Sequence, residues 1–215
     1  LTTNVVSGGD AQSDTLSAIE KVIGSGLNDT LASSTTATTL QGGAGDDLYI
    51  VNGTGVIVSE ATGSGDDEIQ TSLATFSMAS TLNVEKLSYT GALAFSGTGN
   101  AEDNILTGGI GTDVLNGGIG NDRLVGAGGD DNLTGGAGND TLTLTSIANS
   151  LNNISGGKGA DIINLAASAG VDRLVFNVGD SLQGAGMDVI TGFKAAVSAD
   201  VIDLRSFGFD VALQG

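Results

Sequence analysis

Several residue types that commonly carry out chemistry are missing from this chain. Its 215 residues include no cysteine and no histidine. Without cysteine there is no disulfide and no thiolate metal site, and cysteine usage sets no redox constraint on the compartment. Without histidine there is no imidazole base, no Ser-His-Asp triad and no imidazole metal ligand. These absences remove most of the common catalytic and transition-metal centres.

Basic residues and long apolar runs are also scarce. The chain has 7 Lys and Arg against 25 Asp and Glu, which gives a net charge of −18. A polyanion would be repelled, so we expect neither nucleic acid nor an anionic membrane as a partner. No stretch approaches about 18 consecutive apolar residues, so we expect no transmembrane helix and no membrane insertion. Cations are the natural complement of this charge.

Glycine, by contrast, is abundant and regularly placed. The chain has 36 glycines and no proline, and residues 108–143 read as GGIGTDVLN, GGIGNDRLV, GAGGDDNLT and GGAGNDTLT. The strict pattern G-G-x-G-x-D occurs at 42–47, 108–113, 117–122, 135–140 and 156–161. An apolar residue stands two places after each of these aspartates. A short fixed period of this kind predicts a solenoid.

The same spacing continues through less regular units. Looser copies with the acid lie at 24–29, 62–67 and 183–188, while 33–41, 99–107 and 147–155 keep the apolar residue and lose the acid. We therefore divide the chain into N-terminal coils (1–70), a non-repeat strand insert (71–98), the main repeat array (99–191) and a C-terminal cap (192–215). Because the chain begins at Leu1, we expect it to be a fragment of a longer protein.

The insert and the cap are defined by what breaks the period. Residues 71–98 contain no Asp and one Glu, and their apolar residues predict strands near Leu82–Tyr89 and Ala92–Phe95. This insert is either a set of wider coils of the same solenoid or a small packing lobe. Three of the six phenylalanines lie in residues 192–215, as expected of a segment that covers the last coil.

One repeat can be interpreted physically. The apolar eighth residue predicts a three-residue strand with one inward side chain, and the glycines allow a tight turn. Two repeats complete a coil of about eighteen residues, so each loop stacks on the next but one at about 4.8 Å. Stacked aspartates repel each other at this distance unless a cation lies between them. Ca²⁺ suits the position, since it accepts 6–8 oxygen ligands, whereas Mg²⁺ requires a small octahedron.

The pattern resembles the RTX (hemolysin-type) calcium-binding repeats, G-G-x-G-x-D-x-U-x. The resemblance covers roughly residues 9–191, and 187–204 also look like the segment that follows such repeats. It implies an all-β fold, a right-handed parallel β-roll (β-solenoid) with Ca²⁺ bound between stacked turns. In that family the upstream loop supplies the carbonyls of its second and fourth residues and its Asp. The downstream loop supplies the carbonyls of its first and third residues and its Asp.

Carried over residue by residue, the resemblance implies five calcium sites, within a total of about 4–7 ions. One uses Gly109, Gly111, Asp113, Gly126, Gly128 and Asp131. The next uses Gly118, Gly120, Asp122, Gly135, Ala137 and Asp140. A third uses Gly136, Gly138, Asp140, Gly156, Lys158 and Asp161, provided that residues 144–155 form one bulged half-coil. Two more are framed by Asp29, Asp47 and Asp67, with Gly42, Gly43, Ala44, Gly45, Thr62 and Ser64. Asp14, Asp172 and Asp188 fit the register less well.

The resemblance also implies a function. RTX proteins leave Gram-negative bacteria by type I secretion and fold in extracellular calcium, so we expect a secreted or cell-surface module of a larger exported protein. One alternative is a structural surface module, part of an adhesin or S-layer, that self-assembles. A second is a β-helix that binds or modifies polysaccharide. We expect no catalytic residues within this chain, because its acids are committed to the loops.

Overall fold

The computed structural model describes residues 5–7, 20–33, 38–145, 150–165, 170–180, 187–194 and 200–204, and every regular element among them is a β-strand. A four-stranded sheet contains β1 (Val5–Ser7), β2 (Lys21–Ile23), β4 (Thr39–Gln41) and β6 (Ile57–Val58). A seven-stranded sheet contains β8 (Thr75–Ser77), β10 (Ser96–Thr98), β12 (Val114–Ile119), β14 (Asn132–Ala137), β16 (Asn153–Lys158), β18 (Arg173–Val175) and β20 (Val201–Asp203). A nine-stranded sheet contains β3 (Thr30–Ser33), β5 (Leu48–Val51), β7 (Glu68–Thr71), β9 (Lys86–Tyr89), β11 (Ile105–Thr107), β13 (Arg123–Ala127), β15 (Thr141–Leu144), β17 (Ile162–Asn164) and β19 (Val189–Thr191).

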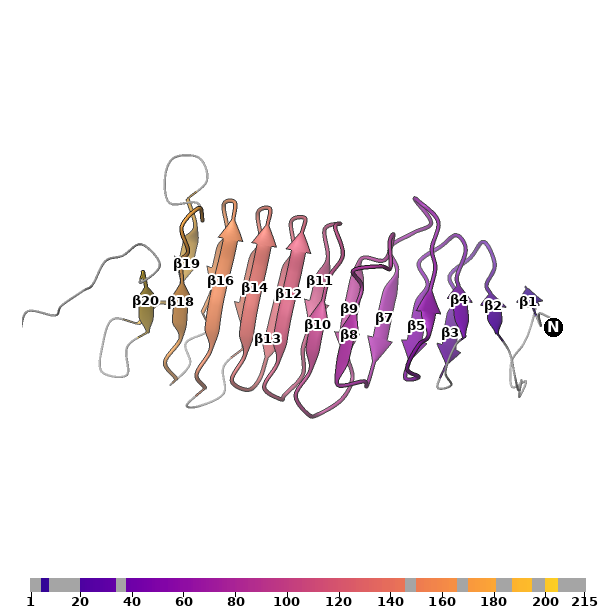
Figure 1. Cartoon of the computed structure of the whole chain (residues 1–215), viewed down its shortest axis with the longest axis horizontal. Coiled ribbons are helices and arrows are strands. Elements are labelled where there is room, and N and C mark those ends of the chain that lie inside the picture. The colour runs from indigo at the N-terminus through magenta and orange to yellow at the C-terminus, as the bar shows by residue number, and fades with distance from the viewer. Residues whose placement is uncertain are drawn as a thin grey trace, which may run out of the picture.

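Consecutive strands alternate between opposite sides of the molecule. From β2 onward the odd-numbered strands lie in the nine-stranded sheet and the even-numbered strands in the other two. The pairings are parallel, for example β12 with β14 and β13 with β15. Each strand inside a sheet therefore lies between strands of the previous and the next coil, and the stack of coils is elongated (Figure 1). The molecule is a parallel β-solenoid, which confirms the predicted fold class.

The nine-residue period sets the register of the core. In the seven-stranded sheet Leu115 pairs with Leu133 and Leu133 with Ile154, and in the nine-stranded sheet Leu106 pairs with Leu124. These side chains are at most 1 % exposed. The residues on either side of each face outward, so in β11, β12 and β14 one side chain per strand enters the core, whereas β5, β9 and β15 each bury two. Burying each aliphatic side chain contributes roughly 1.5–3 kcal/mol.

Residues 71–98 are wider coils of the same solenoid, not a separate lobe. They supply β8, β9 and β10, which pair with β10, β11 and β12 in the two sheets. Gly97 takes an inward position without a side chain, and a Cβ there would lie 2.7 Å from the ring of Phe95. Phe95 fills this space and stacks on Tyr89 with ring centroids 4.5 Å apart.

The strand boundaries within this segment differ from those predicted. The expected strand at Ala92–Phe95 is wrong, because Phe95 turns into the core and β10 begins at Ser96. The first expected strand begins later than predicted, at Lys86, because Leu82 lies in the loop before it and is 58 % exposed. Apolar composition alone did not distinguish strand from turn in a segment without the glycine period.

The C-terminal part continues both sheets as far as it is described. Strands β19 and β20 pair with β17 and β18. Phe193 is 39 % exposed, while Phe207 and Phe209 of the expected cap lie outside the described residues. Within the described part of the chain, we find no helix with the length and apolar character of a membrane span.

Candidate metal centre

The glycine-rich segments form loops along the two edges of the solenoid. We call the ends of the even-numbered strands, together with the loops that lead from them to odd-numbered strands, the first edge. The corresponding connections from odd- to even-numbered strands are the second edge. Asp122, Asp140 and Asp161 lie on the first edge, and so do the N-terminal Asp29, Asp47 and Asp67. Asp113 and Asp131 lie on the second edge. Each loop therefore stacks on a loop one coil away.

Left-handed backbone at the glycines brings adjacent loops into close contact. On the first edge Gly118, Gly120, Gly136 and Gly138 have φ between +110° and +138°. A Cβ on Gly136 would lie 2.1 Å from the carbonyl oxygen of Gly118, and one on Gly138 would lie 1.9 Å from that of Gly120. Only glycine fits here, and the upstream carbonyls point at the next loop.

Carbonyls of the downstream loop point back toward the upstream one. The carbonyl of Ala137 accepts the N–H of Gly120 at 2.9 Å, and that of Lys158 accepts the N–H of Gly138 at 2.8 Å. The carbonyl oxygen of Gly156 lies 2.4 Å from a Cβ built on Gly135. The carbonyls of Gly136 and Gly138 likewise approach Gly157 and Gly159, so the four carbonyls expected for the third set lie between the same two loops.

The aspartates form a ladder through one carboxylate oxygen each. Oδ1 of Asp140 accepts the backbone N–H of Asp122 at 2.7 Å, and Oδ1 of Asp161 accepts that of Asp140 at 2.8 Å. On the second edge Oδ1 of Asp131 accepts the N–H of Asp113 at 3.0 Å. The carboxylates are thus fixed at the spacing of the coils.

The second carboxylate oxygen of these residues has no hydrogen-bond partner. This holds for the buried Oδ2 atoms of Asp47, Asp122, Asp131, Asp140, Asp161 and Asp188. Asp122, Asp131, Asp140 and Asp161 are at most 2 % exposed. A buried carboxylate oxygen without a partner is strongly unfavourable, since a charged group needs compensation in the interior. The loops therefore lack a positive charge at these oxygens.

The acidities of these carboxyls reflect the same deficit. Burial raises the pKa of Asp131 and of Asp140 to about 7, against an ordinary 3.8, although each accepts a backbone hydrogen bond that opposes the rise. Burial likewise raises the pKa of Asp122 and of Asp161 to about 6. A bound cation would favour the ionised form and reverse these shifts.

The predicted second-edge set is also brought together. A Cβ on Gly129 would lie 2.0 Å from the carbonyl oxygen of Gly111, and the carbonyl of Gly109 accepts the N–H of Gly128 at 3.0 Å. The carbonyl oxygen of Gly126 lies 3.0 Å from a Cβ built on Gly108. Here one carboxylate has a partner, because Oδ2 of Asp113 accepts the N–H of Gly109 at 2.6 Å.

The third predicted set, that of Asp140 and Asp161, requires residues 144–155 to form one bulged half-coil. β14 pairs with β16 in register, with Leu133 opposite Ile154, so the longer connection adds residues without shifting the strands. Asp140 and Asp161, which bond across this coil, are 21 residues apart in the sequence, whereas Asp122 and Asp140 are 18 apart. Asp140 and Asp161 therefore face each other across one coil, as the set requires.

The N-terminal loops stack in the same way but carry extra polar contacts. The N–H of Asp29 donates to Asp47 and that of Asp47 to Asp67, both at 2.7 Å, and the N–H of Gly45 donates to the carbonyl of Ser64 at 2.6 Å. A Cβ added to Gly43, Gly24 or Gly65 would clash with the carbonyl oxygen of Ser25, Gly42 or Gly45, respectively, so these loops are in close contact. The N–H of Ala44 donates to the carbonyl of Ser25. Thr62 lies in the same loop as Ser64. The hydroxyl of Ser64 donates to Oδ2 of Asp67 at 3.3 Å.

Some acidic residues at these loops were not predicted as ligands. Glu60 accepts the N–H of Gly42 at 2.6 Å and the hydroxyl of Tyr49. Glu85 accepts the N–H of Asp67 at 2.8 Å. The only sequence signal for Glu60 and Glu85 was that each lies in a connection longer than that of the regular repeat. Asp188, whose register was weak in the sequence, continues the ladder by accepting the N–H of Asp161 at 3.0 Å.

The donor set is typical of a hard cation. Among the described residues no group of three or more Asp, Glu, His or Cys side chains is placed to hold a metal. Each stacked pair of loops in the predicted sets instead offers two carboxylates and several carbonyls, all oxygen ligands. Ca²⁺ accepts such mixed sets at flexible geometry, and the orphaned carboxylate oxygens fit its charge.

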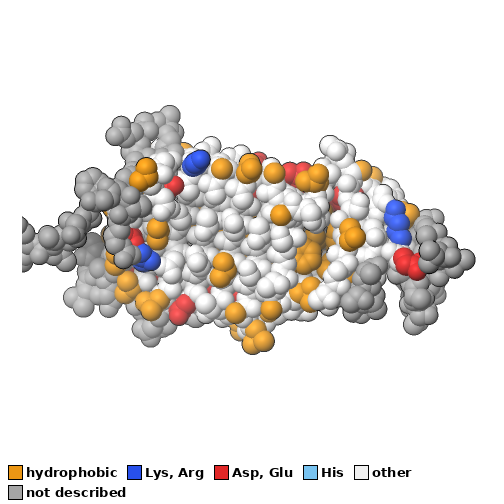
Figure 2. Space-filling view, in the orientation of Figure 1, with side chains coloured by type: hydrophobic (Ala, Val, Ile, Leu, Met, Phe, Trp, Pro, Cys, Tyr) orange, Lys and Arg blue, Asp and Glu red, His pale blue; other side chains and the backbone are white. Residues whose placement is uncertain are grey.

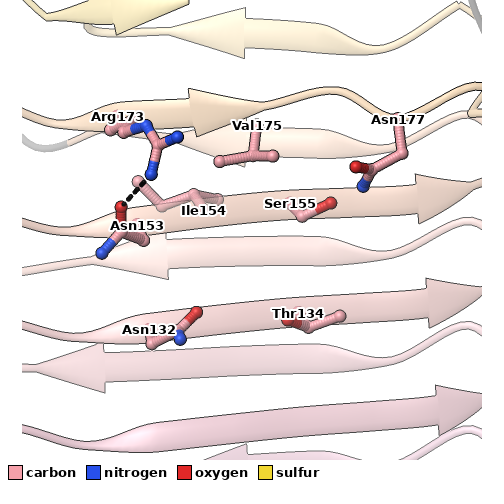
Figure 3. A pocket seen from close by; sticks show the side chains of 8 residues that line it. All are labelled: Asn132, Thr134, Asn153, Ile154, Ser155, Arg173, Val175 and Asn177. Atoms are coloured by element: carbon pink, nitrogen blue, oxygen red, sulfur yellow. Dashed lines mark hydrogen bonds between the residues drawn. The ribbon is translucent and has the colours of Figure 1, made fainter. Parts of the chain in front are cut away.

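A different feature lies on the outer face of the seven-stranded sheet. An open pocket of about 380 Å³ is lined by outward side chains of β14, β16 and β18, with Asn132, Thr134, Asn153 and Ser155 among them (Figure 3). Its one cation, Arg173, is paired with Asp203. Figure 2 shows few charged side chains on this face of the molecule. The pocket therefore offers hydrogen bonds and no unpaired charge.

Fold and loops together define a calcium-binding β-solenoid. The model of the RTX calcium-binding nonapeptide repeat matches in four copies, at residues 23–53, 98–124, 116–144 and 151–181, which together cover just over half of the chain. The chain belongs to this family, a structural calcium-binding module and not a catalytic fold, typical of secreted proteins. No curated protein and no solved structure matches it.

Proposed function

We propose that this chain is a calcium-gated folding module of a larger exported protein. Its metal-free form is largely unfolded inside the cell, and it folds when it meets calcium outside. Folding there supports one-way secretion and then stabilises the exported protein. The observation that carries this proposal is the row of buried aspartate oxygens without partners at Asp122, Asp131, Asp140 and Asp161.

The metal-free fold is opposed by two effects. The buried carboxylates of adjacent coils repel each other, and charge from Asp122 and Asp161 disfavours the ionised form of Asp140. The many glycines also lose more conformational freedom on folding than other residues do. Each ion bound only by the folded state at about 100 times its Kd stabilises that state by roughly 2.7 kcal/mol. Several sites together are enough to decide whether such a chain folds.

The proposed ligands are the five sets described above. Asp140 belongs to two of them and Asp47 to two, so adjacent ions share a carboxylate. The continuation of the ladder from Asp161 to Asp188 supports a sixth position at the C-terminal end of the first edge. We therefore expect five or six ions on the folded chain.

Scattering together with ion counting tests this proposal. An unfolded chain of this length has a radius of gyration of about 50 Å, whereas a compact chain falls below about 20 Å. We expect the first value in chelator and the second in millimolar calcium, with native mass spectrometry reporting five or six bound ions. Magnesium at the same concentration is the control and should not compact the chain. A compact metal-free chain would contradict the proposal.

A second candidate function is carbohydrate binding at the outer-face pocket. The amide and hydroxyl groups of Asn132, Asn153 and Ser155 can bond the hydroxyls of a neutral sugar, and Arg173 is already neutralised. Saturable binding of a neutral polysaccharide to the calcium-loaded chain, lost in the double variant N132A/N153A, would support it. Binding that the double variant retains, or no binding at all, would exclude this pocket.

A further inference from the structure

On the first edge, two adjacent loops lack the paired aspartates of the repeats. They are residues 78–85, between β8 and β9, and residues 99–104, between β10 and β11. Asn104 takes the aspartate position, because its N–H donates to Oδ1 of Asp122 at 2.8 Å as an aspartate does elsewhere on the ladder. The backbone of the loop is therefore retained while the carboxylate is replaced by an amide.

Asparagine side chains fill the space where the repeats leave orphaned oxygens. The amide of Asn100 donates to the carbonyls of Thr81 at 2.8 Å and Val84 at 3.0 Å, and the amide of Asn104 donates to Val84 at 3.3 Å. Both asparagines are at most 6 % exposed. Carbonyls that would otherwise face a cation face N–H donors here.

The oxygens of the same asparagines are also satisfied. Oδ1 of Asn104 accepts the N–H of Asn100 at 2.7 Å, and Oδ1 of Asn100 accepts that of Glu102 at 2.9 Å. The carboxylate of Glu102 in turn accepts the N–H of Asn83. A fully bonded buried polar network stabilises its surroundings, whereas an unpaired charge does the opposite. These two loops thus need no ion between them.

The second-edge loops of the same coils, residues 72–74 and 90–95, contain no acidic residue. Phe95 stands one coil before Asp113, whose Oδ1 accepts its N–H at 2.9 Å, so an aromatic ring takes the place of an acid. The ring is 2 % exposed and stacks on Tyr89. Hydroxyls bond the nearby carbonyls, as Thr71 does to Val51 at 2.6 Å and Thr90 does to Thr71 at 3.1 Å.

From these contacts we infer that residues 68–107, the central segment, fold without calcium and template the rest of the solenoid. The segment comprises β7, β9 and β11 in one sheet and β8 and β10 in the other. It presents strand edges on both sides, to β5 in the N-terminal direction and to β12 and β13 in the C-terminal direction. Calcium-dependent coils then add outward in both directions. The requirement of these flanking coils for calcium rests on the proposed function.

Hydrogen exchange of the full chain in chelator tests the inference. Amides of residues 75–107 are expected to exchange at least about tenfold more slowly than those of residues 113–164, and calcium should then protect both. Fast exchange over the whole chain in chelator would overturn the inference and leave the proposed function standing. Slow exchange of residues 113–164 in chelator would overturn the proposed function itself.

A matched pair of variants isolates the asparagine bridge. Asn104→Asp replaces the buried amide donor with a carboxylate that faces the carbonyl of Val84. It should remove protection of residues 75–107 in chelator and restore it in calcium. Asn116→Asp adds the same charge on an exposed position of β12 and should leave the exchange unchanged. Full protection of Asn104→Asp in chelator would overturn the inference.

Discussion

At the scale of single residues, the sixth position of the repeat separates two kinds of loop. In Asp122 and Asp140, one carboxylate oxygen joins the ladder and the other is buried without a partner. Where it is asparagine, as in Asn104, an amide bonds the neighbouring loop directly. The difference between a carboxylate oxygen and an amide nitrogen at this position thus determines whether a cation is needed between the two loops.

The aspartates should contribute unequally to calcium binding. Asp140 lies between Asp122 and Asp161 on the ladder, whereas Asp113 belongs to one predicted set. We expect Asp140→Asn to remove two ions and Asp113→Asn one, as counted by native mass spectrometry. The control is Asp103→Asn, since Asp103 is exposed and bonds only Asn121. Equal losses in all three variants would contradict the assignment.

The metal-free chain should respond to pH through the same carboxyls. The pKa values of Asp131 and Asp140 in the fold, about 7, and those of Asp122 and Asp161, about 6, exceed the ordinary 3.8. The fold therefore binds more protons than the unfolded chain and loses stability as pH rises from about 4 to 7. In chelator we expect more β-structure at pH 5 than at pH 8, as measured by circular dichroism. A gain of structure with rising pH would refute this.

At the scale of elements, the loops are as restrictive as the strands. The strands need one apolar residue in nine, but the loops need glycine wherever carbonyls of the previous coil approach the backbone. Gly138 shows this most clearly, with φ of +138° and the carbonyl of Gly120 in the place of a Cβ. Glycine at this position therefore allows two candidate ligand loops to lie in close contact.

Substitution of that glycine should destabilise the calcium-loaded fold. Gly138→Ala forces the loops apart and strains the backbone, which we expect to reduce the free energy of unfolding by about 1–3 kcal/mol in saturating calcium. Chemical denaturation measures this value. Gly26→Ala serves as the comparison, because a Cβ there meets nothing within 4 Å. Comparable destabilisation by both changes would argue against a special role for Gly138.

The regular part of these elements could be predicted from the sequence because a fixed period fixes register. The spacing alone placed Leu106 beside Leu124 and Asp122 one coil from Asp140. What escaped prediction depends on contacts between residues without a period. The stacking of Phe95 on Tyr89, which shifts the start of β10, is one such contact, and the reach of Glu60 to Gly42 is another.

At the scale of the whole molecule, the solenoid has no core that is independent of its coils. Each coil buries its apolar residues only against its neighbours, so stability accumulates coil by coil and depends on what lies between the loops. The net charge of −18 opposes compaction until cations are bound. Calcium then acts on the folding of all the coils that flank the central segment, not on one local site.

The most direct test of this account is a calcium titration of the full chain followed by far-ultraviolet circular dichroism. We predict a largely unordered spectrum in chelator that changes cooperatively to a β-sheet spectrum as calcium is added, with no comparable change in magnesium. A complete β-sheet spectrum in excess chelator, with cooperative thermal unfolding and no response to calcium, would contradict it.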